Sequence, residues 1–206
     1  RAQLQQEDER GAIVTYEQLL HAHPHSTLAR KASLERAMLY RNLRQNDEAI
    51  AAYRQTIEKF PATEEAYTAL DALQALYVEQ GNVNEYLAYT KNLAKMNMSV
   101  TTQEDSLVYA AAEIQYMQAA YQKAIVSLSN YITQYCSGGR YCTTARYYLA
   151  DSYYRLGKTT EALKEYAVLA DQSANPYQEE AAIRVAEISY DTGDYAKALE
   201  AFYRMN

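Results

Sequence analysis

The chain has 206 residues and a formal net charge of −6, from 20 Lys and Arg against 26 Asp and Glu. No Lys/Arg-rich stripe appears, so a general electrostatic grip on nucleic acid is not expected, and no run of about 18 apolar residues suggests a membrane span. Only 6 Gly and 3 Pro occur, while Ala, Leu, Glu, Gln and Lys dominate, which favours helices over tight β-turns.

Apolar periodicity predicts helices along the whole chain. In chain order they fall at about 2–8, 11–22, 27–43, 46–59, 63–79, 83–95, 103–117, 121–134, 141–156, 159–171, 177–191 and 195–205. The longest expected loops are Lys95–Thr102 and Cys136–Tyr141. No linker divides the chain, so we expect a single solenoid over residues 1–206.

An internal repeat orders these helices. Six segments place a small residue four positions before an aromatic or large apolar residue, the third matching poorly: Ala12/Tyr16, Ala49/Tyr53, Tyr86/Thr90, Ala124/Leu128, Ala162/Tyr166 and Ala198/Phe202. The first members of these pairs are separated by 37, 37, 38, 38 and 36 residues. A period of this length corresponds to two helices and two short connections.

A second set of small residues stands on the preceding helices, at Ala37, Ala112, Ala150 and Ala186. Small residues on both helices of a pair allow close approach, and larger apolar residues fill the space around them. The segments 150–166 and 186–202, each with a small residue, a Gly turn, an Ala and an aromatic residue, resemble the tetratricopeptide repeat.

The resemblance implies an all-α fold, a right-handed superhelical solenoid of antiparallel helix pairs with about six repeats of 36–38 residues. Pro24 and Pro61 stand where the family's terminal proline stands. A truncated first helix and the lack of a polar capping helix lead us to expect an excerpt of a longer protein. In the third repeat Gln74 and Tyr86 replace small residues, which predicts a wider or shifted helix pairing and a bend there.

The family's concave groove is lined by the first helix of each repeat, so the resemblance also implies a binding surface. Carried over, the groove positions are Tyr109, Glu113, Tyr116, Tyr147, Asp151, Tyr154, Arg155, Ile183, Glu187 and Tyr190. Such a Tyr–acid–Tyr ladder suits an extended or helical segment that carries Lys/Arg and apolar groups. The alternative is that these tyrosines pack between repeats and the acids are solvated.

Cys136 and Cys142 flank a five-residue loop and could form a disulfide in an oxidising compartment; two free thiols are the alternative. The segment His21–His25 holds all three histidines, and we expect an exposed loop rather than a metal site. Paired carboxylates such as Glu64 and Glu65 stand at helix starts, where the helix dipole explains them. No phosphate loop or nucleophile motif appears. We therefore expect no catalytic residue, no metal and no cofactor, and a protein that is not an enzyme.

These observations favour a protein–protein interaction scaffold with a protein or peptide partner. One alternative is a structural spacer or oligomerisation segment that self-associates through uncapped ends; another is a small-ligand or glycan-binding accessory protein. The long period and the 22 tyrosines resemble large tetratricopeptide proteins of the envelope of Bacteroides-like bacteria. That resemblance implies a periplasmic or cell-envelope location, with the cytoplasm as the alternative.

Overall fold

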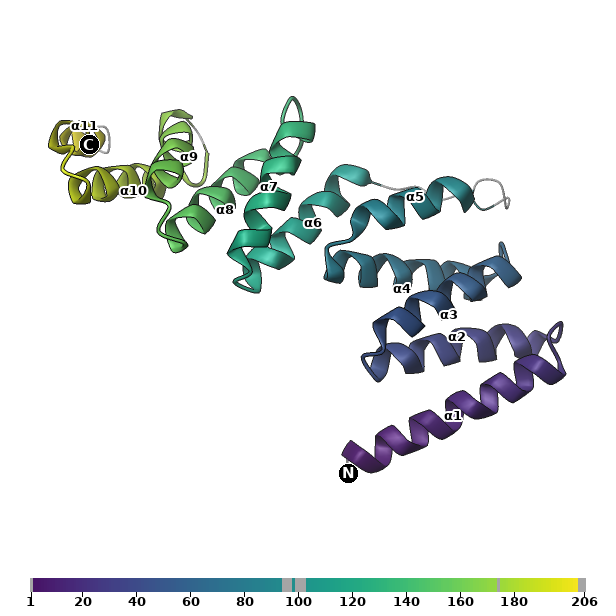
Figure 1. Ribbon diagram of the computed structural model, residues 1–206. Helices are drawn as coiled ribbons and strands as arrows, with labels where there is room; N and C mark the ends of the chain where they lie inside the picture. Colours follow the sequence, from purple (N-terminus) through teal and green to yellow (C-terminus); the bar gives the residue numbers. More distant parts are fainter. Residues whose placement is uncertain (1, 94–97, 99–102, 174, 204–206) are drawn as a thin grey trace. The chain divides into compact units, whose positions relative to one another are not determined.

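The computed structural model describes residues 2–93, 98, 103–173 and 175–203. Within these residues every regular element is an α-helix (Figure 1). The helices are α1 (Ala2–Ala22), α2 (Thr27–Asn42), α3 (Asn46–Lys59), α4 (Glu64–Gln80), α5 (Val83–Leu93), α6 (Glu104–Met117), α7 (Tyr121–Tyr135), α8 (Cys142–Arg155), α9 (Thr159–Asp171), α10 (Gln178–Asp191) and α11 (Tyr195–Tyr203). The predicted all-α helical-repeat class is confirmed.

One helix prediction is wrong. The sequence predicts separate helices at 2–8 and 11–22, whereas α1 is continuous through Gly11. A glycine inside a helix costs about 1 kcal/mol relative to alanine but does not by itself break the hydrogen-bond ladder. The ends of α5 and α11 border residues outside the described ranges, and the other helix ends lie within one residue of the predicted ones. Most of the predicted loop Lys95–Thr102 lies outside the described residues.

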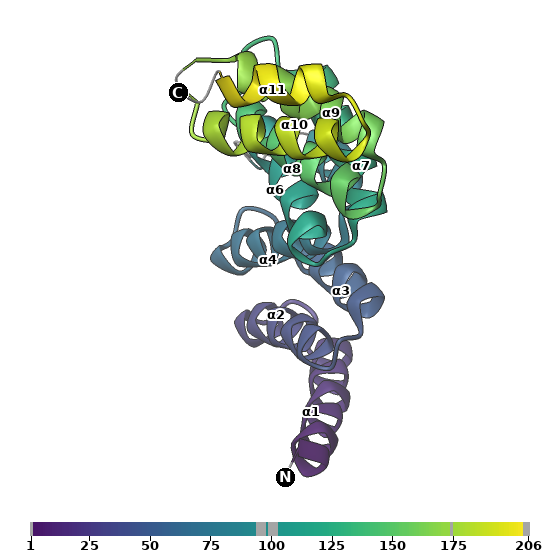
Figure 2. The same ribbon diagram turned by 90° about the vertical axis from the view of Figure 1, so that its left-hand side faces the viewer.

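The chain forms two compact units, Arg1–Thr102 and Gln103–Asn206. The first contains α1–α5, and the second contains α6–α11. Within each unit a helix packs mainly against the helices that precede and follow it, as Figures 1 and 2 show for α2–α4 and for α8–α11. The boundary falls after the irregular third repeat. A single solenoid over 1–206, its handedness and the bend stay predictions.

Helix ends follow local sequence. At the start of α2 the Ala29 N–H donates to the Ser26 hydroxyl at 3.0 Å, and this cap satisfies one of the free amide groups of the first turn. After α8 the turn residue Gly157 has φ 70°, a left-handed conformation that glycine adopts without strain. Ala119 takes the corresponding position after α6 with φ 57°, so the predicted glycine-free turn has the same geometry at a steric cost.

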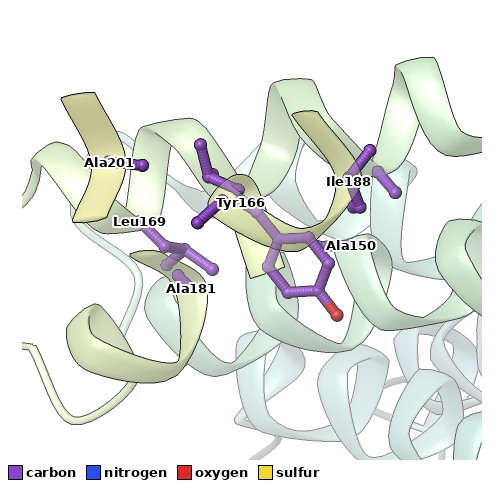
Figure 3. Packing of buried hydrophobic residues seen from close by; sticks show 9 residues of the cluster. Ala150, Tyr166, Leu169, Ala181, Ile188 and Ala201 are labelled. Carbon is purple, nitrogen blue, oxygen red and sulfur yellow. The ribbon is translucent and has the colours of Figure 1, made fainter. Parts of the chain in front are cut away.

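The small residues of the repeat are buried where paired helices meet. Ala37, Ala49, Ala112, Ala124, Ala150 and Ala162 are fully buried, and Ala186 is nearly so. Figure 3 shows one such junction, where Tyr166 of α9 lies among Ala150, Leu169, Ala181 and Ile188. The predicted packing of large residues around small ones is therefore present in the structure.

In the third repeat, two large residues occupy positions that hold small residues in the other repeats, and they contact each other. Tyr86 is buried, and its hydroxyl donates to Gln74 Oε1 at 3.1 Å, so the substituted side chains satisfy each other. Burial, followed by the nearby Asp71 carboxylate, raises the pKa of Tyr86 to about 12. The predicted wider or shifted pairing of α4 and α5 stays a prediction.

Candidate binding surface

The ten predicted groove residues lie on α6, α8 and α10, but they do not share one degree of exposure. Tyr109 and Asp151 are buried; Glu113, Tyr116, Tyr147 and Tyr154 are half-buried; Arg155, Ile183, Glu187 and Tyr190 are exposed. The structure therefore divides the predicted ladder into an inner part on α6 and α8 and an outer part centred on α10.

The inner part is a network of tyrosines and carboxylates. Tyr116 of α6 donates to Asp151 of α8 at 2.8 Å, and the Nε of Arg155 donates to the same carboxylate oxygen at 3.0 Å. The other Asp151 oxygen accepts from Tyr166 at 3.4 Å. Asp151 is only 4% exposed, so these three donors compensate for the cost of burying its charge. Burial first, and then the hydrogen bond to Asp151, raises the pKa of Tyr116.

Two further tyrosine–carboxylate bonds extend this pattern. Tyr109 donates to Glu113 within α6 at 2.7 Å, and Tyr147 of α8 donates to Glu180 of α10 at 2.7 Å. The pKa of both tyrosines is raised, mainly by burial and next by these bonds. Phenol hydroxyls held this way are neutral donors at physiological pH, which suits packing rather than acid–base chemistry.

Stacked tyrosine rings join the first helix of one repeat to the start or body of the next. The ring centroids lie 4.2–4.4 Å apart in three nearly parallel pairs: Tyr109 with Tyr141, Tyr116 with Tyr148, and Tyr147 with Tyr177. Such offset contacts add to the stabilisation that burial provides. In the fourth and fifth repeats, Tyr109, Tyr116 and Tyr147 therefore pack between repeats, which is the alternative to their lining a groove.

Sequence reasoning missed the partners Tyr141, Tyr148 and Tyr177. Two of them, Tyr141 and Tyr177, directly precede α8 and α10, and they stand 36 residues apart. Their equal placement before the first helices of two successive repeats is a sequence signal that points to them. The resemblance does not indicate these tyrosines, because the groove positions of the family lie further along each helix.

The outer part of the ladder borders an open hollow of about 850 Å³. Side chains of α8, α10 and α11 line it, and we call it the α10–α11 hollow: Tyr154, Ile183, Arg184, Ala186, Glu187, Tyr190, Asp191, Tyr195, Ala198, Leu199 and Phe202. Figure 2 looks onto α10 and α11. Four predicted groove residues, Tyr154, Ile183, Glu187 and Tyr190, meet here.

The α11 side chains of this hollow were not predicted. Leu199 is exposed, and Phe202 is 61% exposed beside Tyr190, which is 64% exposed. The sequence assigned Phe202 to the repeat's packing position, where its counterparts Tyr53, Leu128 and Tyr166 are buried. Only the tertiary structure shows that no described residue covers it.

The hollow has a charged rim. Arg184 pairs with Glu187 at 2.9 Å, and its guanidinium lies 5.1 Å from the centre of the Tyr154 ring. Glu187 and Asp191 are exposed. The hollow thus combines large apolar side chains with two accessible acids, an arrangement able to hold apolar and cationic groups.

The two cysteines lie away from this hollow, between α7 and α8. Cys136 and Cys142 are joined by a disulfide with their Cα atoms 5.4 Å apart. The loop between them is tight, because a Cβ at Gly139 would lie 2.6 Å from the Tyr135 carbonyl oxygen. The Tyr141 N–H donates to the Tyr131 hydroxyl at 3.3 Å, which ties the loop to the tyrosines of α7.

The remaining residues singled out in the sequence are at the surface. His21, His23 and His25 are exposed around the end of α1. In the part of the chain that the structure describes, no three His, Cys, Asp or Glu side chains gather as metal ligands. The acidic pair Glu64–Glu65 lies in the first turn of α4, as predicted, and Glu179–Glu180 lies in the first turn of α10. No described helix is both long and apolar enough to cross a membrane.

The fold and its repeated junctions define a helical-repeat protein. Sequence profiles described as tetratricopeptide repeat match residues 31–63 and 147–205. In these two segments the chain carries tetratricopeptide repeats, as the sequence predicts. The resemblance to envelope proteins of Bacteroides-like bacteria stays a prediction.

Several solved structures resemble the chain. YrrB, described as a tetratricopeptide-repeat protein with an unusual peptide-binding site, is 16% identical over 92% of this chain and 90% of its own, with a TM-score of 0.43. MamA is 20% identical over 81% and 90% of the two chains, with a TM-score of 0.44. A tetratricopeptide-repeat protein from Parabacteroides merdae is 19% identical over 98% and 73%, with a TM-score of 0.37. No curated protein sequence matches the chain. Similarity at this level carries no functional conclusion.

Proposed function

We propose that the chain is a non-catalytic scaffold that binds a segment of a partner protein in the α10–α11 hollow. Tetratricopeptide repeats support protein–protein interaction in general. The observation that carries this specific site is the group of large apolar side chains exposed together there, with Tyr190, Leu199 and Phe202 around one hollow. Contiguous exposed apolar surface of this kind marks interaction sites.

The chemistry of the hollow favours an apolar segment with flanking Lys or Arg. Aromatic side chains such as Tyr190 and Phe202 are low-entropy anchors, and they contribute strongly when a partner desolvates them. Glu187 and Asp191 at the rim would orient a cationic partner and speed its association. The overall charge of −6 acts in the same direction.

The inner network is assigned a supporting role in this proposal. Hydrogen bonds join Tyr116 of α6 to Asp151 of α8, and Tyr147 of α8 to Glu180 of α10. In the proposal these side chains hold the three helices in register and do not contact the partner. Arg155 of α8 and the half-buried Glu113 of α6 stay predicted groove residues.

The location proposed for this scaffold is the periplasm or cell envelope of a bacterium. The Cys136–Cys142 disulfide supports it, because disulfides persist in oxidising compartments. The cytoplasm is the alternative, and there the two thiols would be kept reduced. Fractionation of the native host cells, with thiol alkylation before lysis, separates these locations.

A display library of peptides tests the binding function. We expect the full chain to select peptides with apolar residues and Lys or Arg, and Phe202→Ser to weaken binding by at least about tenfold, since it removes an anchor. The matched control is Val126→Ser on α7, which changes an exposed apolar side chain outside the hollow. Selection of acidic peptides, or equal binding by the Phe202→Ser chain, would contradict the proposal.

A further inference from the structure

We propose that the Cys136–Cys142 disulfide is a redox-sensitive link at the junction between the fourth and fifth repeats, and that its reduction releases Tyr141 from Tyr109 of α6. The two cysteines lie outside the α10–α11 hollow, so this inference is separate from the proposed binding function. Its basis is internal to the chain, because the same kind of junction occurs twice and only one of the two contains a disulfide.

The disulfide joins the end of α7 directly to the start of α8. Cys136 follows the last residue of α7, and Cys142 is the first residue of α8. Tyr141 stands at the N-cap position of α8 but makes no side-chain capping bond, so the disulfide takes the place of a cap in holding this helix start. Both cysteines are half-buried, and Ser137 and Gly138 between them are exposed, so a small reductant has access to the loop.

Tyr141 connects the loop between the cysteines to α6 and α7. Its ring stacks on Tyr109 of α6 with the centroids 4.4 Å apart, and its hydroxyl oxygen lies 3.3 Å from that of Ser106. Its N–H donates to the Tyr131 hydroxyl of α7 at 3.3 Å. Tyr109 is only 6% exposed, and the parallel ring of Tyr141 covers one of its faces. Release of Tyr141 would therefore uncover Tyr109, one of the predicted groove residues.

The junction between the fifth and sixth repeats has the equivalent tyrosine but no disulfide. Tyr177 precedes α10, its ring stacks on Tyr147 of α8 with the centroids 4.2 Å apart, and its hydroxyl donates to Thr144 at 3.4 Å. Here the Asn175 side chain makes the link. Its Nδ2 donates to the Leu169 carbonyl of α9 at 2.9 Å, and its Oδ1 accepts from the Tyr177 N–H at 2.9 Å.

The two links differ in what can open them. The hydrogen bonds of Asn175 do not respond to a reductant, whereas a dithiol can open the Cys136–Cys142 bond. One thiolate of the dithiol attacks a cysteine sulfur and breaks the S–S bond, and its second thiol then displaces the mixed disulfide. The reductant leaves as a cyclic disulfide, and two electrons and two protons convert the cysteines to thiols.

The loop between the cysteines gains freedom when the bond opens. The amide groups of Gly138 and Gly139 share one acceptor, the Tyr135 carbonyl oxygen, at 3.2 and 2.6 Å. Adjacent glycines lose more conformational entropy than other residues when they are ordered, so a loop that contains them depends on its covalent link. The second loop instead contains Asn175 and Pro176, and proline restricts the backbone by itself. Reduction should therefore release the first junction and leave the second in place.

Amide hydrogen exchange in the 206-residue chain, measured before and after incubation with dithiothreitol, compares two matched groups. The Ala145 N–H of α8 and the Ala181 N–H of α10 each donate at 2.8 Å to the carbonyl of the tyrosine that precedes the helix. We expect exchange at Ala145 to become at least about tenfold faster on reduction, and exchange at Ala181 to change little. Thiol alkylation of the same sample followed by mass spectrometry shows whether the bond is open.

Nuclear Overhauser contacts between tyrosine rings measure the release itself. We expect the contact between Tyr109 and Tyr141 to disappear on reduction, while the contact between Tyr147 and Tyr177 remains. A chain with both cysteines replaced by Ser should lack the first contact with or without the dithiol. The matched variant Asn175→Ala should speed exchange at Ala181 equally in both redox states.

Three results would overturn the inference. One is a bond that the dithiol leaves closed in the folded chain. Another is an opened bond with unchanged exchange at Ala145 or a persistent contact between Tyr109 and Tyr141. The third is equal acceleration at Ala145 and Ala181, because the bond would then stabilise the whole unit rather than one junction.

Discussion

At the scale of single residues, Asp151 shows how the same side chain can serve binding or packing. Its position in the repeat predicts a groove, but its carboxylate accepts from Tyr116, Tyr166 and Arg155 and is nearly inaccessible. A buried carboxylate without hydrogen-bond donors destabilises the fold, so the contribution of Asp151 to stability depends on all three donors.

Replacement of Asp151 by Ala tests this role. We expect a loss of about 2–3 kcal/mol in the free energy of unfolding, because the Tyr116 and Tyr166 hydroxyls lose their shared acceptor. Urea unfolding monitored by circular dichroism measures it. The control Asp191→Ala, at an exposed position of the rim, should change stability little. Similar losses for both variants would contradict the structural role of Asp151.

Tyr86 predicts a specific pH dependence. Its pKa in the folded chain is about 12, above the ordinary 10.0, chiefly because of burial. A tyrosine with a raised folded pKa contributes its full stability below pH 10, and this contribution is lost as pH rises towards 12. We expect the free energy of unfolding to fall over that window, and the fall to be shallower in Tyr86→Phe.

Urea unfolding at several pH values between 9 and 11.5 measures this slope. Tyr67→Phe is the matched control, because Tyr67 is exposed on the neighbouring helix α4. If Tyr86→Phe and Tyr67→Phe have the slope of the unmodified chain, the burial of Tyr86 does not govern its titration.

At the scale of helices and turns, the connections after α6 and α8 have the same backbone geometry although their residues differ. The amide groups after each helix bond back to it in the same way, with Ala120 N–H to the Gln115 carbonyl and Lys158 N–H to the Tyr153 carbonyl, both at 2.9 Å. The turn residue is Ala119 in one case and Gly157 in the other, and both have positive φ. The backbone thus keeps its path even where the residue is unfavourable.

A reciprocal pair of substitutions measures that cost. We expect Ala119→Gly to stabilise the chain by about 1 kcal/mol, and Gly157→Ala to destabilise it by about as much, because left-handed φ strains any residue with a Cβ. No atom lies within 4 Å of a Cβ built on Gly157, so conformational strain rather than a clash sets the effect. Effects of the same sign in both variants would contradict this reasoning.

The disulfide belongs to the connection between α7 and α8. Replacing both Cys136 and Cys142 by Ser should lower the free energy of unfolding by about 2 kcal/mol, since the bond closes a short loop in the unfolded chain. Hydrogen exchange should rise in residues 136–141 and leave α10 unchanged. Exchange that rises equally in both places would show that the bond stabilises the unit as a whole.

At the scale of the whole molecule, the candidate site belongs to the second unit, Gln103–Asn206. In this unit, tyrosine stacks and tyrosine–carboxylate bonds join α6, α8 and α10, and these helices support the proposed site in the α10–α11 hollow. A partner that binds this folded site should raise the stability of the unit by mass action.

Thermal unfolding tests that expectation and the remaining ligand classes. With a peptide selected from the display library at about 100 times its Kd, apparent stability should rise by about 2.7 kcal/mol, while glycans should leave the unfolding temperature unchanged. The Phe202→Glu variant is the control, and its stability should not rise when the peptide is added. A shift with glycans that Phe202→Glu removes would favour a glycan-binding accessory protein instead.

The amino-acid sequence by itself determined the repeat, the helices and the family. Ala49, Ala124 and Ala162 recur at the repeat spacing, and local propensity and turn residues mark nearly every helix end, because these signals depend on neighbours in the chain. Gly11 misled the prediction, since a glycine in a helix is a small cost that the rest of α1 outweighs.

Only the tertiary structure decided which members of the Tyr–acid ladder are accessible. Tyr166 and Phe202 occupy the same place in the repeat, yet α10 buries the first, and no described residue buries the second. Burial depends on what another helix places over a side chain, and no local pattern contains that information. The proposed binding surface therefore lies on the face shared by α10 and α11 rather than on α6 and α8.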